Sequence, residues 1–188
     1  MTDVAGALRA VVDALERLNV DYVLVGSVAA AAWGVVRSTR DADLVAFMDS
    51  NHLRAMLAGL DRREFYVPED FADSAVRSGG SFNVLHLTGG GKVDIFVPVS
   101  GDSFAQSRLS RRVRAEVLGV RAWMATPEDV LLAKLRWRLE SRSEMQWRDC
   151  IEIAASNQLD LQYLNRWAPT LGVEVDLAEL LRSVETSD

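Results

Sequence analysis

The chain has 188 residues, a formal net charge of -6, and a composition that is 49% hydrophobic and 26% charged. Such a length and composition predict a folded protein with its own core and exclude an intrinsically disordered chain. The acidic balance argues against a broad nucleic-acid-binding surface, and the single cysteine, Cys150, excludes an internal disulfide and suits a reducing cytoplasmic location. No stretch approaches the roughly 18–20 apolar residues that cross a membrane, so we expect no membrane association.

The first elements follow one another closely. Residues 3–18 carry apolar side chains at helical spacing, which predicts an amphipathic helix and not a signal peptide. The apolar run Tyr22–Val25 predicts a strand that ends in Gly26-Ser27, and an alanine-rich helix follows until Gly34. A second strand is expected from about 43 to 48, and residues 49–51 are good N-caps for the helix after it.

The middle of the chain predicts a β-hairpin, because two strand-like runs, 82–87 and 92–97, are joined by three glycines. A short helix, 68–76, precedes it, and a further strand is expected at 120–124. Thr126-Pro127 is a strong helix start. Four C-terminal helices are expected, at 126–139, 146–155, 161–171 and 177–184. The chain therefore divides into a mixed α/β part, residues 1–125, and a helical region, residues 126–188.

Three acids mark the candidate site. Asp41 and Asp43 are two residues apart, so on a strand both carboxylates point to one side. Asp94 lies inside an apolar strand, where an acid is costly without a compensating partner. If the two strands pair, the three carboxylates converge and favour Mg²⁺ or Mn²⁺, and two such ions would suit phosphoryl or nucleotidyl transfer. Asp-x-Asp alone is more often a solvated pair or a helix cap, so Asp94 carries the hypothesis.

The Gly26-Ser27 turn is a candidate phosphate site. A helix that starts directly after a strand presents free backbone N–H groups and the positive end of its dipole to an anion. Glycine allows close approach of a phosphate, and the serine hydroxyl adds a donor. The alternative is a serine that acts as an ordinary N-cap.

Basic residues elsewhere have two interpretations each. Lys134 lies within the apolar stripe of its helix, so it either snorkels outward or meets an anion such as a triphosphate. Arg37 and Arg40 flank the acids, where they contact phosphate or balance charge. Asp149 orients Lys134 or Arg37 by an ion pair, or is a first-turn acid. The arginines between 108 and 114 line an acceptor groove for RNA or form a solvated face.

These residues together resemble the nucleotidyltransferase superfamily that includes DNA polymerase beta, and within it small bacterial nucleotidyltransferase-like proteins. The chain is also similar to nucleotidyltransferase toxins of abortive-infection systems. The matching stretches span nearly the whole chain, at 26–29, 34, 37–43, 82–84, 92–98, 127–130, 134–135 and 146–149. The resemblance implies the nucleotidyltransferase fold, of class α/β (α+β): a small mixed sheet flanked by helices, with a C-terminal helical region.

The resemblance also implies residue roles. Asp41, Asp43 and Asp94 would bind the metals and catalyse the transfer, with Asp94 helping to deprotonate the acceptor. A nucleoside triphosphate (NTP) would be bound by five residues: Gly26, Ser27, Arg37, Thr39 and Lys134. Three more would support the site from outside it: Arg40, Arg148 and Asp149.

The expected function is magnesium-dependent transfer of a nucleoside monophosphate from an NTP to a hydroxyl of RNA or protein, as by a toxin with an antitoxin partner. One alternative is an antibiotic-modifying nucleotidyltransferase of the aminoglycoside or lincosamide type. Another is a nucleotide-binding module of the same fold without catalysis. The presence of all three acids argues against the last.

Overall fold

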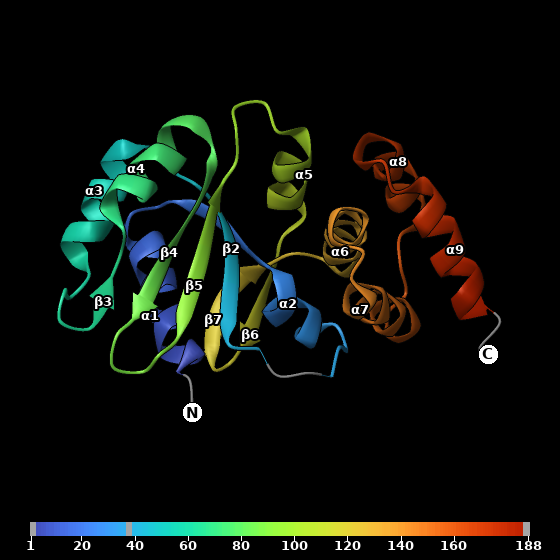
Figure 1. The fold of residues 1–188 in the computed structure, drawn as a ribbon, viewed down its shortest axis with the longest axis horizontal. Helices are drawn as coiled ribbons and strands as arrows, with labels where there is room; N and C mark the ends of the chain where they lie inside the picture. Colours follow the sequence, from blue (N-terminus) through green and yellow to red (C-terminus); the bar gives the residue numbers. More distant parts are fainter. Residues whose placement is uncertain (1–2, 37–38, 186–188) are drawn as a thin grey trace. The chain divides into compact units, whose positions relative to one another are not determined.

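The computed structural model describes residues 3–36 and 39–185, and it confirms the predicted mixed α/β architecture (Figure 1). One sheet contains seven strands in the order β3-β4-β5-β2-β1-β7-β6. The strands are β1 (Asp21–Val25), β2 (Asp41–Phe47), β3 (Phe65–Tyr66), β4 (Gly80–His86), β5 (Lys92–Val97), β6 (Val113–Val117) and β7 (Val120–Met124).

The helices agree with the predicted ones to within a few residues at most ends. They are α1 (Val4–Arg17), α2 (Gly26–Ala32), α3 (Ser50–Gly59), α4 (Glu69–Ser78), α5 (Ser103–Arg111), α6 (Pro127–Ser141), α7 (Glu144–Ser156), α8 (Leu161–Leu171) and α9 (Glu174–Glu185). Within the part of the chain that the structure covers, no helix is long and apolar enough to cross a membrane.

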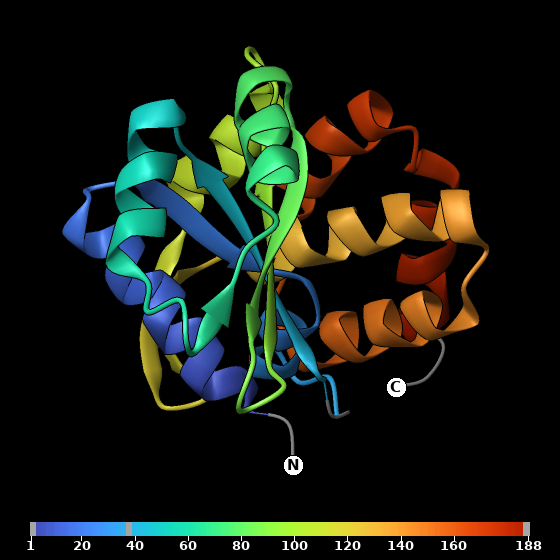
Figure 2. The ribbon, with the colours of Figure 1, turned by 60° about the vertical axis from the view of Figure 1, so that its left-hand side comes forward.

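The sheet is mixed because β2 pairs in parallel with β5, and β1 with β7, while the other neighbours are antiparallel. The predicted hairpin is therefore confirmed as β4 and β5. Helices α1, α3 and α4 lie in front of the sheet in Figure 2 and cover one of its faces. The apolar side of α1, with Leu8, Val11 and Leu15 fully buried, packs there.

The described residues form two compact units. The first contains residues 3–28 and 39–125, and the second contains residues 29–36 and 126–185. In the second unit, Thr126 caps α6 by accepting the N–H of Asp129 at 3.4 Å. Asn157 ties residues 29–36 to α7, because its side chain donates to the carbonyls of Trp33 and Ile153 at 2.8 Å each.

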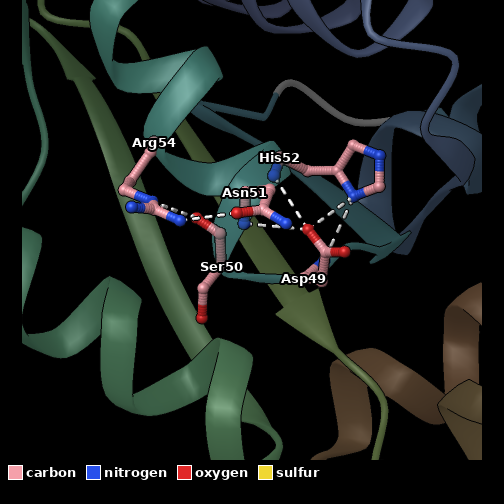
Figure 3. Close-up of polar contacts among 5 residues, drawn as sticks. All are labelled: Asp49, Ser50, Asn51, His52 and Arg54. Carbon is pink, nitrogen blue, oxygen red and sulfur yellow. Dashed lines mark hydrogen bonds and ion pairs between the residues drawn. The ribbon is translucent and has the colours of Figure 1, made fainter.

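The turn from β2 into α3 is held by a reciprocal cap (Figure 3). The Asp49 carboxylate accepts the N–H groups of Asn51 and His52, both at 2.9 Å, and the His52 ring accepts the N–H of Asp49 at 3.4 Å. This capping box fixes the end of β2 and confirms the predicted helix start.

Three elements were not predicted: β3, α5 and β6. The last two contain most of the arginines between 108 and 114, which interrupt apolar periodicity. In β6, Arg114 forms an ion pair with Glu16 at 2.5 Å, and Arg112, just before the strand, pairs with Asp21 at 2.9 Å. Both guanidinium groups also lie over Trp123: that of Arg112 is 4.9 Å from the ring centre, and that of Arg114 is 5.2 Å from it. These two arginines therefore hold the sheet edge together.

Candidate active site

The register of two parallel strands builds the candidate site. Asp43 on β2 is paired with Asp94 on β5, and Asp41 is paired with Lys92. Between them, Ala42 and Val93 point the other way into the core and are fully buried. The four charged side chains therefore share one face of the sheet, as alternation along a strand requires. The pairing of the two strands that carry the three acids is therefore confirmed.

Lys92 lies among these acids. Its ammonium nitrogen is 2.8 Å from Oδ2 of Asp94 and 3.4 Å from Oδ2 of Asp41. The pKa of Lys92 is raised, mainly because its ammonium donates a hydrogen bond to Asp94. Our sequence analysis did not include Lys92 in the site. The signal was present, because Lys92-x-Asp94 repeats on β5 the two-residue spacing of Asp41-x-Asp43.

Asp43 is the most constrained of the acids. Its carboxylate accepts the backbone N–H of Ser27, the second residue of α2. Gly26 adopts a φ of +65°, and a Cβ atom there would lie 1.9 Å from Oδ2 of Asp43. The sequence predicted a glycine for the approach of a phosphate. The geometry gives it another reason, because only glycine leaves room for Asp43 and adopts this backbone without strain.

Burial raises the pKa of Asp43 to about 6, and the neighbouring Asp94 carboxylate is the next cause. Asp41 raises it further, while the Ser27 N–H and the Lys92 ammonium lower it. One lysine therefore does not neutralise three carboxylates, and the site favours additional positive charge.

The donor set suits a divalent cation. Carboxylate oxygens are the ligands that Mg²⁺ and Mn²⁺ prefer, and the Lys92 ammonium already provides a cation between two of the carboxylates. Among residues 3–36 and 39–185, no three His, Cys, Asp or Glu side chains are grouped to hold a metal ion as they stand. Binding of an ion at Asp41, Asp43 and Asp94 thus requires Lys92 and these side chains to move.

Other predicted residues lie around this site or outside it. The Thr39 hydroxyl donates to the carbonyl of Asp41 at 2.8 Å and accepts its N–H at 3.3 Å, which fixes the start of β2. Arg40 is exposed directly before that strand. Arg37 lies outside the described residues. The nucleotide-binding roles of Gly26, Ser27, Arg37 and Thr39 stay predictions.

Lys134 lies in the second unit and has carboxylate and amide partners. Its ammonium donates to Asp149 at 2.6 Å and to Gln146 at 3.0 Å. Only 6% of the Lys134 side chain and 4% of the Asp149 side chain are exposed. The ion pair proposed as one role of Asp149 is therefore formed, whereas Arg148 is exposed on α7. A triphosphate contact of Lys134 stays a prediction.

Comparison with known proteins identifies the family of the chain. The family model described as "Nucleotidyltransferase of unknown function (DUF6036)" matches residues 1–176. None of the curated protein sequences matches the chain.

Several solved structures share the fold. An antigenic nucleotidyltransferase-like protein from Paracoccidioides brasiliensis is 19% identical, with a TM-score of 0.60 over 96% of this chain and 93% of its own. ANT(2")-Ia in complex with adenylyl-2"-tobramycin is 15% identical, with a TM-score of 0.60 over 91% and 97%. The lincomycin-bound lincosamide adenylyltransferase LnuA is 16% identical, with a TM-score of 0.53 over 81% and 97%.

We predict that Asp43→Asn stabilises the metal-free protein at neutral pH. The pKa of Asp43, about 6, lies above its ordinary value of 3.8, so the folded protein holds this proton more tightly than the unfolded chain. Wild-type stability therefore falls as pH rises between these values, by up to about 3 kcal/mol for two pKa units. Asparagine removes that loss and still accepts the Ser27 N–H.

Chemical denaturation in EDTA at pH 4, 5, 6 and 7.5 measures this effect. The stabilisation by Asp43→Asn should be near zero at pH 4 and largest at pH 7.5. Asp73→Asn is the matched control, because the Asp73 side chain on α4 is 42% exposed and its loss weakens only an ion pair with Arg77. A stabilisation by Asp43→Asn that does not change with pH would contradict the electrostatic explanation.

Gly26→Ala should destabilise the protein more than a glycine with similar backbone strain. Gly101 is the matched control: its φ is +84°, and a Cβ atom there meets nothing within 4 Å. Both substitutions carry the cost of a left-handed backbone, about 1–2 kcal/mol. Only Gly26→Ala also drives a methyl group into Asp43, which should add about 1–3 kcal/mol as an overpacked contact does. Equal losses in urea denaturation would show that Asp43 does not require this glycine.

Proposed function

Because the chain belongs to the DUF6036 family of nucleotidyltransferases, we propose that it transfers a nucleoside monophosphate from an NTP to an acceptor hydroxyl and releases pyrophosphate. One observation carries the proposal: Asp41 and Asp43 on β2 lie in register beside Lys92 and Asp94 on β5. Three carboxylates on one sheet face, with a single lysine between them, provide an anionic centre that a divalent cation would complete.

In this proposal Asp41, Asp43 and Asp94 hold Mg²⁺ or Mn²⁺. When bound, such ions stabilise the charge on the attacking and leaving oxygens of the transfer. Asp94 is proposed to take the proton of the acceptor hydroxyl, and the 22% exposure of its side chain supports this role. The Asp43 carboxylate accepts the Ser27 N–H, which connects the proposed metal site to the start of α2.

The triphosphate is proposed to bind at the turn between β1 and α2. Gly26 and Ser27 stand directly beside Asp43, so phosphates at this turn would lie next to the carboxylates. Thr39 supports β2 from its start, and Arg37 and Arg40 add positive charge close by in the sequence. As the resemblance implies, Lys134 would bind the NTP, and Asp149 and Arg148 would support the site from outside it.

For the acceptor we propose RNA or a protein, with the chain acting as a toxin controlled by an antitoxin in the cytoplasm. The alternative acceptor is an antibiotic. It is favoured by the shared fold of two enzymes, ANT(2")-Ia with adenylylated tobramycin and LnuA with lincomycin. The two acceptor classes predict different phenotypes on expression. Modification of RNA or protein should arrest growth and label that acceptor, whereas modification of an antibiotic should give drug resistance without toxicity.

The experiment incubates purified protein with each α-³²P-labelled NTP, Mg²⁺ and three acceptor pools: total RNA, cell protein, and a panel of aminoglycosides and lincosamides. Wild type should label one pool. Asp41→Ala with Asp43→Ala should reduce labelling by at least about 10²-fold, as expected when electrostatic stabilisation of a transition state is removed.

Asp73→Ala is the matched control, because Asp73 pairs with Arg77 on the exposed side of α4, and it should label as wild type does. Comparable labelling by the double variant and wild type would exclude the proposed mechanism. Tight NTP binding without transfer to any pool would instead support a non-catalytic nucleotide-binding module.

A further inference from the structure

Lys92 is built into the acidic face of the sheet. Its strand register places it beside Asp41, and it lies two residues before Asp94 on the same side of β5. Its ammonium contacts both carboxylates, at 3.4 and 2.8 Å, and 32% of the side chain is exposed. The ammonium thus bridges two of the three acids from two different strands.

The use of lysine at this position is unusual for this chain. Only two of its 21 Lys and Arg residues are lysines, Lys92 and Lys134, and both form ion pairs with Asp. A lysine ammonium is a compact point charge on a flexible stem, whereas a guanidinium is a planar fork that binds a carboxylate through two parallel hydrogen bonds. A compact, flexible cation is suited to a site from which it has to move away.

Charge balance makes the bridge necessary when no metal is bound. Asp43 and Asp94 are direct neighbours across β2 and β5, and Asp41 lies on the same face. Without Lys92, three carboxylates would face one another at the start of two strands, and their repulsion would oppose the parallel pairing. The same oxygens of Asp41 and Asp94 are those that a divalent cation would bind.

We propose that Lys92 is an internal counter-cation that holds Asp41 and Asp94 in place in the metal-free protein and competes with the divalent cation for them. Lys92 is a positioning residue in this scheme, because it acts through the carboxylates. The inference rests on the proposed function only in that these acids take up a divalent cation. Two effects of opposite sign follow: removal of the ammonium weakens the metal-free fold and strengthens metal binding.

The test compares wild type with Lys92→Met, which keeps an unbranched side chain one heavy atom shorter and removes the charge. Mn²⁺ binding is titrated by electron paramagnetic resonance of free Mn²⁺, and thermal unfolding is followed in EDTA and in Mn²⁺. Lys92→Met should unfold at a lower temperature in EDTA and bind Mn²⁺ about tenfold more tightly, the counterpart of an interaction of about 1.4 kcal/mol. The gain in unfolding temperature on adding Mn²⁺ should be larger than for wild type.

Two further variants separate competition from other effects. Lys92→Arg keeps the charge and can hold a carboxylate through two hydrogen bonds, so it should bind Mn²⁺ no more tightly than wild type. Arg77→Met removes one positive charge from the same unit at an exposed ion pair with Asp73, and it should leave Mn²⁺ affinity unchanged. If Lys92→Met does not fold in EDTA, Lys92→Gln, which can still donate a hydrogen bond to one carboxylate, is titrated in its place.

The outcomes distinguish this inference from the proposed function. Mn²⁺ binding by wild type with equal or weaker binding by the uncharged variant would overturn the competition and leave the metal site intact. Binding by neither protein would overturn both the metal site and the competition. Tighter binding by the uncharged variant, together with its lower stability in EDTA, would establish Lys92 as the competing cation.

Discussion

Repulsion among three carboxylates on one sheet face is the constraint on which the site depends. The parallel pairing of β2 with β5 sets Asp43 beside Asp94, with Asp41 two residues away. The surrounding residues respond to this charge: the Ser27 N–H donates to Asp43, and Lys92 bridges Asp41 and Asp94. Each contact is local, yet together they join β5, β2 and the start of α2. The strand pairing that brings the carboxylates together therefore also brings the groups that reduce their repulsion.

The Ser27 N–H and the Lys92 ammonium offset only part of the negative charge of the three carboxylates, and this remaining charge points to function. Strands of a sheet core are normally stabilised by apolar packing, and the opposite face of β2 and β5 has that character, with Ala42, Leu44 and Ile95 fully buried. Replacing the acids by neutral side chains would remove the unfavourable burial of the Asp43 charge, which is the main cause of its raised pKa. A chain that keeps such groups gives up stability, which is the usual relation between a binding site and the fold that carries it.

The sequence predicted the elements that follow a simple period. Alternation in 92–97 identified β5 and made Asp94 conspicuous, and the three glycines located the hairpin. Apart from the hairpin of β4 and β5, the sequence could not show which strands pair or in which register, because this pairing depends on contacts between distant segments. Lys92 was missed for that reason, since its importance arises from its position beside Asp41. Likewise β6 was missed because its stability comes from distant partners, Glu16 on α1 among them.

The two lysines show how the fold and the chemistry are linked. Lys134 pairs with Asp149 in the interior of the helical unit, and Lys92 pairs with Asp41 and Asp94 at the sheet face. A buried ion pair adds little net stability, because desolvation offsets much of the attraction, so stability alone does not account for Lys134. The distinction between them is exposure. Lys92 is within reach of solvent and of an incoming cation, and its partners are acids that a metal can take over. In the proposed scheme, Lys92 therefore keeps Asp41 and Asp94 on the sheet face until a divalent cation replaces its ammonium.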